Sequence, residues 1–334
     1  MGRASDFITR GDSVIIGRKG NINNPILMRE PFWNVDTAFG LEPNEEQLAV
    51  EYLYYFCEWF NFEKLNKAVT IPSLTKADLL EIAMPLPPLS AQKKFTRRIG
   101  LLDDLKSLLA DLERRLDDLV KSQFVEMFGG YGADSEYGCA RLGKLLSVEP
   151  QNGLYKPQRY YRTDCGGTPI VRVDAFSNGS VFSYASLKRL DCSESELENY
   201  ALHEGDIVMN RVNGSIERVG KVALIKGLNG ATVYESNMMR FHVDECRLNA
   251  TYIVHVLCSD DIRKQIKSCA RIANQCSVNQ ENVMGLQVPL PPLALQQQFA
   301  DFVAKVDKLG FDCCREIVCC GVLFSSMSAS LLCT

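Results

Sequence analysis

Two long segments of the chain carry apolar residues at alternating steps of three and four positions. The first runs through residues 91–128, and the second begins at Ala294. This spacing places one apolar stripe along an α-helix, and charged residues of both signs occupy the other faces of the first segment. The sequence therefore predicts two long helices whose stripes pack on each other. The residues of this seam are Phe95, Leu105, Leu109, Leu112 and Leu116 in the first helix and Phe299, Phe302 and Val306 in the second.

Shorter strand and helix patterns precede each long helix. Residues 13–16 and 207–209 follow a Gly-Asp pair and are rich in Val and Ile, which is typical of strands entered from a turn. Residues 168–173 have the pattern of a buried strand, and residues 49–60 and 251–267 have that of helices. Short strands combined with a few helices indicate the α+β class. The predicted parts are a partial first globular domain at 1–90, a central long helix at 91–130, a second globular domain at 131–293 and a C-terminal long helix at 294–334.

A proline-rich motif occurs twice and marks the entrance to both long helices. It reads L-P-P-L-S-A-Q-K-K-F at 86–95 and L-P-P-L-A-L-Q-Q-Q-F at 290–299, a constant offset of 204 residues (290 minus 86). Prolines hold the chain extended, so a helix begins only after them. A repeat at fixed offset indicates a duplicated plan of globule, helix, globule, helix.

The duplication extends into the globular parts, where Gly11-Asp12 corresponds to Gly205-Asp206 at an offset of 194 residues (205 minus 11). Residues 139–204 precede this pair in the second domain, but only residues 1–10 precede it in the first. We therefore expect the first domain to lack its N-terminal half. The two aspartates follow glycines at turns, and we expect both to act as capping or turn residues.

Composition and motifs argue against chemistry on this chain. The net charge of −4 excludes a uniformly basic coat, although a local basic face remains compatible with it. The sequence contains no phosphate-binding loop with its lysine, no methyltransferase signature and no zinc-protease motif, so we predict no catalytic residues. The thirteen cysteines include two adjacent pairs at 313–314 and 319–320, but their spacing does not match a zinc site, and we expect no metal.

The last eighteen residues, 317–334, carry no charge and leave two interpretations open. A seam that packs on the first long helix is one of them. A membrane anchor at the C-terminus is the other, since eighteen residues just reach the length of a span. The N-terminal residues 1–12 carry charges and have no apolar run, so we expect no signal peptide.

Two globular domains that each end in P-L-P-P-L-x-x-Q and a long seam helix resemble the specificity subunit of type I restriction-modification systems. The segment L-D-D-L-V-K-S-Q-F-V-E-M-F-G at 116–129 is similar to the central conserved region of that family. The resemblance implies that each domain is a target recognition domain, which reads one half of a split site in double-stranded DNA. It also implies that the two long helices form an antiparallel coiled coil and that the chain is not an enzyme.

The resemblance further implies partners that hold the cofactors. Methyltransferase subunits would bring S-adenosylmethionine, and restriction and translocase subunits would bring ATP and Mg²⁺, whereas this chain would bind no cofactor itself. Self-association is also expected, because a second copy would supply a complete second reader. The resemblance places the complex in the cytoplasm. A truncated or silent-cassette copy, which serves only as a helical scaffold for partner subunits, is the alternative.

Reading DNA requires hydrogen-bonding side chains on loops, together with cations for phosphates. The second domain offers three such loops at 153–157, 210–215 and 274–277. Each has a plain alternative, namely an ordinary surface loop for the first and helix capping for the last, and Arg172 could equally form a salt bridge. The residues predicted to bind DNA are Tyr155, Lys156, Arg172, Asn210, Arg211, Asn213, Ser215, Arg218, Lys221 and Gln275, with Arg18, Lys19 and Asn21 in the corresponding loop of the first domain.

Overall fold

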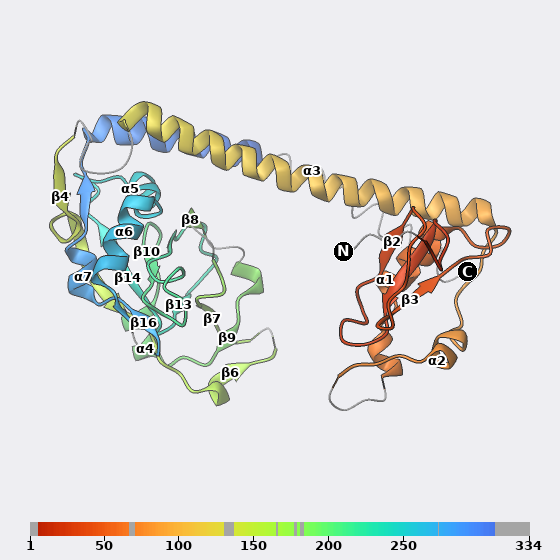
Figure 1. Cartoon of the computed structure of the whole chain (residues 1–334). Coiled ribbons are helices and arrows are strands. Elements are labelled where there is room, and N and C mark those ends of the chain that lie inside the picture. Colours follow the sequence, from red (N-terminus) through yellow and green to blue (C-terminus); the bar gives the residue numbers. More distant parts are fainter. Residues whose placement is uncertain are drawn as a thin grey trace. The chain divides into compact units, whose positions relative to one another are not determined.

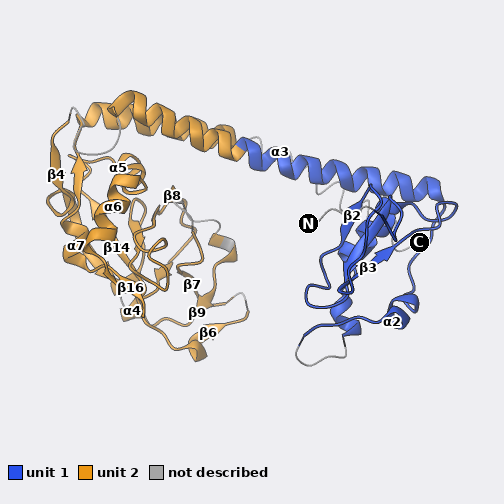
Figure 2. Ribbon diagram, viewed as in Figure 1, with its two compact units in different colours: residues 1–112, 313–334 blue, residues 113–312 orange. Residues whose placement is uncertain are grey.

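The chain is described by a computed structural model, which covers residues 6–66, 71–129, 137–164, 166–176, 179–180, 184–272 and 274–310. It divides into two compact units, shown in different colours in Figure 2. Unit 1 comprises residues 1–112 and 313–334, and unit 2 comprises residues 113–312. Helix α3 (Leu89–Phe128) contributes to both units. The predicted boundaries at residues 90, 130 and 293 follow the sequence repeat, whereas these units follow contacts and divide α3 itself.

Unit 1 contains a small antiparallel sheet with a helix packed on it (Figure 1). Strand β1 lies between the other two, in the order β2-β1-β3. The strand predicted at residues 13–16 is β1, and the helix predicted at residues 49–60 is α1. The elements are β1 (Ser13–Gly17), β2 (Ile26–Met28), β3 (Ala38–Leu41), α1 (Val50–Trp59), a 3-10 turn (Phe62–Leu65) and α2 (Lys76–Leu80).

The core of unit 1 forms between β1 and α1. Alternate side chains of β1 are apolar and face the apolar side of the helix. Val14 and Ile16 of the sheet pack in one buried cluster with Val50 and Leu53 of the helix and with Phe62. Burial of these side chains removes apolar surface from water, which is the main driving force for packing the layers.

Unit 2 is built on a larger, mixed set of sheets. The central sheet has the order β5-β14-β10-β12-β8, and only its β12–β8 pair is parallel. Three smaller sheets have the orders β11-β16-β15, β13-β7-β9-β6 and β17-β4. The strands are β4 (Cys139–Arg141), β5 (Leu146–Asn152), β6 (Tyr161–Arg162), β7 (Thr168–Val171), β8 (Gly179–Ser180), β9 (Arg189–Leu190), β10 (Ile207–Asn210), β11 (Val212–Asn213), β12 (Val222–Leu224), β13 (Val233–Tyr234), β14 (Met238–Val243), β15 (Arg271–Ile272), β16 (Cys276–Ser277) and β17 (Gln287–Pro289).

Short helices pack on these sheets. They are α4 (Glu194–Tyr200), α5 (Ala250–Leu257), α6 (Asp260–Cys269) and α7 (Gln280–Met284), with 3-10 turns at Leu142–Leu145, Gln158–Tyr160 and Tyr184–Ser186. The single helix predicted at residues 251–267 is wrong, because it is two helices. The Ser259 hydroxyl accepts a hydrogen bond from the backbone N–H of Ile262 and starts α6 anew.

Residues 293–310 form the second long helix, which packs antiparallel to the C-terminal part of α3 within unit 2 (Figure 1). The Phe299 ring lies 5.3 Å from the Phe124 ring and 5.7 Å from the Phe128 ring. Eleven residues later, Gly310 lies beside Leu116. The chain directions are therefore opposite. The aromatic rings meet edge to face, a favourable geometry that adds to the burial of their area.

The predicted seam is only partly reproduced in the described residues. Leu116, Phe299, Phe302 and Val306 all belong to the core that joins the two helices, together with Val120. Phe95 instead packs on Tyr52 of unit 1, with 5.7 Å between the rings. Leu105, Leu109 and Leu112 are half-buried. The residues predicted to continue the second helix beyond 310, including the uncharged segment 317–334 and the four paired cysteines, lie outside the described part.

The proline motif repeats in structure as well as in sequence. In unit 1, the buried Gln92 amide donates to the carbonyl oxygens of Gln47 and Pro87, at 2.8 and 2.7 Å, and accepts from the N–H of Ala49 at 2.9 Å. These bonds join the start of α3 to the start of α1. A fully buried amide stays in place only when its donors and acceptors are satisfied, which explains why glutamine recurs here.

Unit 2 reproduces these bonds at matching positions. The Gln296 amide donates to Pro291 at 2.8 Å and Arg247 at 3.3 Å, and accepts from the N–H of Asn249 at 2.8 Å. Helix α5 is thus the counterpart of α1 at an offset of 200 residues (249 minus 49). Two tyrosine hydroxyls also form matching bonds in the two units. Tyr52 donates to the carbonyl of Pro85 at 3.1 Å, and Tyr252 donates to the carbonyl of Pro289 at 3.2 Å.

The alignment of the two Gly-Asp pairs shifts by one residue in the structure. The residue with left-handed backbone is Asp12 in unit 1, with φ of 53°, and Gly205 in unit 2, with φ of 83°. The ladders agree, because Val14 pairs with Leu41 in unit 1 as Ile207 pairs with Phe241 in unit 2. The offset at these strands is therefore 193 residues (207 minus 14) rather than 194.

Candidate nucleic-acid interface

Arg18 and Arg211, both predicted to bind DNA, occupy the same place in the two units. Each follows the first strand of its repeat at the offset of 193 (211 minus 18). Arg18 Nη1 donates to the carbonyl of Asp36 at 3.3 Å, and Arg211 Nη1 donates to the carbonyl of Ser236 at 3.0 Å.

The backbone of the two arginines is held in the same way. The Arg18 N–H donates to Thr37 and its carbonyl accepts from Leu74, and the Arg211 N–H donates to Asn237 and its carbonyl accepts from Val278. Two separate units thus fix an arginine with the same set of bonds. The sequence suggested corresponding loops, but only the hydrogen bonds establish this residue-by-residue equivalence.

An arginine that sequence analysis missed binds the backbone of the loop that follows Arg211. Arg263 of α6 donates through Nη2 to the carbonyls of Ile216 and Glu217, at 3.1 and 2.9 Å, and through Nη1 to that of Val219. A planar guanidinium can bridge several carbonyls at once, so it fixes the shape of this loop. A lone arginine in a helix pattern gives no signal of that role.

Other predicted residues of this loop differ in exposure. Asn210 is buried, and its side-chain oxygen has no hydrogen-bond partner among the described residues. Asn213 lies in β11 and caps the turn by accepting from the Ser215 N–H at 3.1 Å. Ser215 and Arg218 are exposed, whereas Lys221 is half-buried and immediately precedes β12.

Gln275 lies in the exposed turn between β15 and β16, next to the loop of Arg211. Strand β16 pairs with β11, and Ser277 lies opposite Val212. Gln275 and the nearby Arg271 and Ile272 are all exposed, with Ile272 at 69%. The helix-capping alternative for Gln275 does not hold, since Asn279 caps α7.

Tyr155, Lys156 and Arg172 are brought together by the fold, although they lie on separate loops. They line a cavity of about 720 Å³ in unit 2. Ser236 and Asn237, which bind Arg211, line it as well, so this arginine adjoins the cavity. Arg218, Lys221 and Gln275 do not line it. The remaining lining residues are Leu154, Gln158, Tyr161, Arg162, Thr163, Lys188 and Glu235.

Carboxylates near the cavity partly offset the positive charge of its lysine and arginine side chains. Lys156 Nζ lies 2.8 Å from Glu196, which raises the pKa of this lysine, and 4.5 Å from the centre of the Tyr160 ring. Arg172 follows β7 rather than lying inside it, and its Nε is 3.6 Å from Asp174 and 3.8 Å from Glu235.

The salt-bridge alternative for Arg172 is therefore present in this structure. Its Nε is buried and has no hydrogen-bond partner among the described residues. A ligand with an acceptor atom could therefore accept a hydrogen bond from this Nε. Tyr155 beside it is 75% exposed, so an aromatic ring is available at the edge of the cavity.

Unit 1 places Lys19 and Asn21 after Arg18 on an exposed loop. The backbone of Lys19 forms an isolated β-bridge with Ser73. In unit 2, Val212 pairs with Ser277 at the corresponding positions. The Arg18 guanidinium also lies over the Phe39 ring, at 5.8 Å from its centre. These three residues thus occupy the counterpart of the Arg211 loop.

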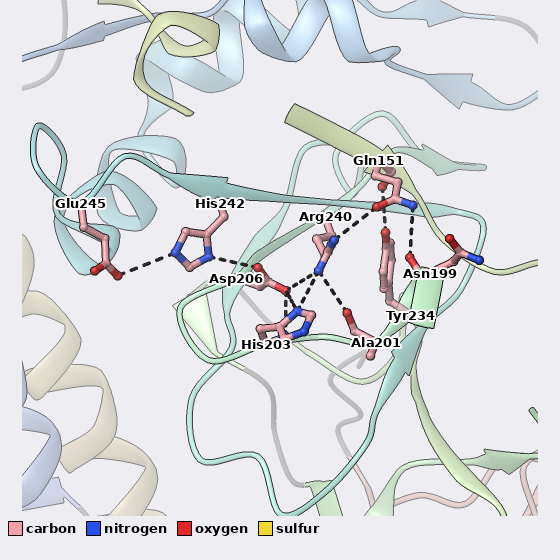
Figure 3. Close-up of polar contacts among 9 residues, drawn as sticks. All are labelled: Gln151, Asn199, Ala201, His203, Asp206, Tyr234, Arg240, His242 and Glu245. Atoms are coloured by element: carbon pink, nitrogen blue, oxygen red, sulfur yellow. Dashed lines mark hydrogen bonds and ion pairs between the residues drawn. The ribbon is translucent and has the colours of Figure 1, made fainter. Parts of the chain in front are cut away.

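A polar network centred on the buried Asp206 involves strand β14 of unit 2, and sequence analysis missed most of it (Figure 3). Asp206, expected to be a turn residue, does accept from the N–H of His203 at 2.8 Å. Its carboxylate also lies 3.2 Å from Arg240 Nη1 and 3.1 Å from His242 Nδ1, and only 2% of the residue is exposed. Asp12, by contrast, pairs with Arg29 at the surface, at 2.9 Å.

Arg240 extends this network across β14. Its guanidinium also donates to the carbonyl of Ala201 at 3.1 Å and to the side chain of Gln151 at 3.3 Å. Figure 3 shows these residues converging on Arg240 from separate segments. A buried ion pair of this kind fixes one arrangement of the strands, because removing a partner leaves the other charge uncompensated.

Comparison with known proteins decides the family. Residues 1–118 and 136–315 match the type I restriction modification DNA specificity domain. The chain belongs to this specificity family. A specificity subunit of the type I restriction enzyme EcoKI from Escherichia coli (strain K12) is 26% identical over 265 residues, which cover 73% of this chain and 54% of that protein. The StySPI specificity subunit of Salmonella potsdam is 23% identical over 332 residues, covering 92% of this chain and 69% of that protein.

The chain spans about half the length of the EcoKI relative. Among solved structures, the S subunit of a type I restriction-modification system from M. genitalium superposes with a TM-score of 0.57 at 15% identity, covering 97% of this chain and 84% of that one. This likeness shows that the α+β fold of the specificity family is shared.

In the described part of the chain, no three His, Cys, Asp or Glu side chains gather as a metal site would require. No helix within the same residues is long and apolar enough to cross a membrane.

Proposed function

We propose that this member of the specificity family is the non-catalytic subunit that recognises DNA sequence for a type I restriction-modification complex. In this role it directs methylation and restriction to a bipartite site. The observation that carries the proposal is the pair Arg18 and Arg211, held by matching bonds in two repeated units. Arginine is the side chain that most often reads guanine, through two parallel hydrogen bonds.

The cavity beside Arg211 supports a DNA-reading role for unit 2. It combines an exposed aromatic ring, several cations and backbone groups, which together suit bases and phosphates. Acidic neighbours hold Lys156 and Arg172 in place, so the cations are oriented before a ligand arrives. Phosphate contacts by Arg218 and Lys221 would add affinity without sequence preference.

The proposal includes partners that carry out the chemistry. Methyltransferase subunits would supply S-adenosylmethionine, and restriction and translocase subunits would supply ATP and Mg²⁺, all in the cytoplasm. Self-association of this chain is a further part of the proposal, since a second copy would add a second complete reader. No cofactor is assigned to this chain.

Co-expression with the cognate methyltransferase subunit, followed by mapping of methylated adenines, tests the proposal. We expect one bipartite motif, because each unit would read one half. A single half-motif would assign reading to unit 2 alone, and a palindrome would assign it to unit 2 in a dimer of the chain. A complex that methylates without sequence preference would overturn the proposal.

A scaffold that carries partner subunits without reading DNA is the second candidate. It is favoured by the small size of the sheet in unit 1, which has three strands in the described residues. Gel shifts with and without the methyltransferase subunit distinguish the candidates. A scaffold would give no sequence-dependent shift of a DNA duplex in either case.

A further inference from the structure

The loop that follows Arg211 in unit 2 rests on one face of helix α6. Residues 214–220 of this loop connect β11 to β12 without forming a strand. Three side chains of α6 lie against them, namely Arg263, Ile266 and Lys267. Their spacing of three and four residues places them on the same face of the helix. One face of α6 therefore supports the whole loop.

Arg263 binds three carbonyls of the loop backbone with one side chain. Its Nη2 donates to Ile216 and Glu217, at 3.1 and 2.9 Å, and its Nη1 donates to Val219. Only 17% of the Arg263 side chain is exposed. Because the guanidinium group is planar and rigid, the three carbonyls that it binds keep fixed positions relative to one another.

Gly220 ends the loop in close contact with α6. Its φ of 77° lies in the left-handed region, and a Cβ atom added there would collide with the Ile266 side chain. Glycine is the residue that combines this backbone conformation with so little volume. The Gly220 N–H also donates to the carbonyl of Asn210 at 2.7 Å, so the end of the loop is bonded to the strand that precedes it.

The same face of α6 neutralises the acidic residue of the loop. The Glu217 carboxylate lies 2.7 Å from Lys267 Nζ and 3.7 Å from Arg263 Nη2. An uncompensated carboxylate next to Arg218 would repel the phosphates that Arg218 is proposed to contact. Helix α6 thus controls both the shape and the charge of this loop.

Unit 1 restrains the corresponding loop with different atoms. Asn23 lies in the loop that follows Arg18, and its side-chain oxygen accepts from the Phe62 N–H at 2.8 Å. Its amide nitrogen donates to the Asn61 side chain at 3.1 Å. Asn61 and Phe62 begin the 3-10 turn after α1, and α6 is the helix after α5, the counterpart of α1. In both units, the loop is therefore bonded to the segment that follows the short helix.

We propose that these restraints determine how well each loop discriminates between DNA sequences, with Arg263 as the positioning residue of unit 2. The inference rests on the proposed function and deepens it. Base contacts require accurately placed donors, whereas phosphate contacts carry no sequence information. A loop that is ordered in advance also loses less conformational freedom when DNA binds. Loss of the restraint should therefore reduce affinity for the specific site more than affinity for DNA in general.

Arg263→Lys separates the geometry of this residue from its charge. Lysine keeps the positive charge but lacks the planar fork that bridges three carbonyls. Affinity for a duplex that carries the motif mapped by methylation should fall about tenfold. Affinity for a duplex of scrambled sequence should change by less than about twofold, because the charge is kept. Fluorescence anisotropy of labelled duplexes measures both, with the full chain bound to its methyltransferase subunit. Partial unfolding would lower both affinities by the same factor, so their ratio reports on the loop.

Duplexes altered in one half-site at a time assign the effect to one unit. Arg263→Lys should lose discrimination only in the half-site that unit 2 reads, and Asn23→Ala only in the other half-site. The matched control is Arg247→Lys, because the Arg247 guanidinium also donates to a backbone carbonyl, that of Lys144 at 2.7 Å. This control should leave discrimination in both half-sites unchanged.

Hydrogen exchange of the free chain tests the restraint itself, without DNA. Arg263→Lys should accelerate exchange of the amides of residues 216–221, and Arg247→Lys should not. Unchanged exchange would overturn the inference. Unchanged discrimination in Arg263→Lys, or a loss in both half-sites, would also overturn it, and the proposed function would stand because the wild-type chain still prefers the motif. A wild-type chain that prefers no sequence would overturn the proposed function and this inference with it.

Discussion

Arg18 and Arg211 each donate one guanidinium N–H to a backbone carbonyl, which leaves most donors of the fork for other partners. In each unit the carbonyl fixes the direction of the arginine side chain. A residue held in this way loses little rotamer freedom when it meets a base, so more of its binding energy is retained.

Replacement of Arg211 by alanine should weaken binding to one half of the DNA site by about 1–3 kcal/mol, if the arginine contacts guanine. Arg18→Ala should act on the other half-site. Fluorescence titrations with duplexes that alter one half-site at a time measure both effects. Lys264→Ala, on the exposed face of α6 with 77% side-chain exposure, serves as the control. Equal losses on all sequences would show that these arginines bind phosphate rather than bases.

The buried carboxylate of Asp206 connects two segments of unit 2, the turn at His203 and strand β14. Asp206→Asn keeps the shape and removes the charge that compensates Arg240. We expect a loss of about 3 kcal/mol in the free energy of unfolding, measured with urea. The control Asp12→Asn changes the exposed aspartate that pairs with Arg29, so it should have little effect. Equal stability of the two variants would contradict this role for Asp206.

In both copies of the repeat, a glutamine connects the start of the long helix to its own unit. Gln92 and Gln296 each join the long helix to the short helix of its own unit, through bonds that correspond position by position. The proline motif explains only where each helix begins. The glutamine explains why each helix begins against its own globular unit.

Gln296→Ala should lower the stability of unit 2 by about 1–3 kcal/mol, because it leaves the part-buried Asn249 N–H and the buried Pro291 carbonyl without this partner. Urea unfolding followed by circular dichroism measures the loss. The neighbouring Gln298 is exposed, so Gln298→Ala is the matched control. If both variants unfold at the same urea concentration, the proposed role of Gln296 is wrong.

The contact of α5 with the two long helices should make stability depend on pH. His255 lies in a cavity of about 380 Å³ with Lys226 and Asp307, and burial lowers the pKa of His255 to about 4 from 6.5. Between these two values the unfolded chain binds a proton that the folded chain excludes. Stability should therefore fall as pH is lowered through this window, by roughly 3 kcal/mol at most.

Asp307 opposes this trend, because burial raises its pKa and the folded chain then takes up a proton more readily. Tyr184, Cys258, Asp117 and Lys121 complete the titratable groups of the cavity. His255→Gln should flatten the loss of stability between pH 6.5 and 4, measured as urea midpoints at several pH values. An unchanged slope in the variant would assign the pH dependence to other groups.

At the scale of the whole molecule, duplication organises recognition. Each unit has its own core and its own arginine loop, so each should read DNA independently. Replacing residues 139–285 with the matching segment of another specificity subunit should change one half of the methylated motif and preserve the other. Mapping of methylated adenines after co-expression measures this. A motif that changes in both halves, or in neither, would contradict independent reading.

The sequence by itself determined the repeat, the two long helices and the polar loops, because these depend on local periodicity and on residue types that stop or start helices. It also singled out the polar loop that contains Arg211, since loop composition is local. The tertiary structure alone decided that Arg18 matches Arg211, that Arg263 braces the loop and that Asp206 is buried beside Arg240. These depend on contacts between residues far apart in the chain, which no local pattern encodes.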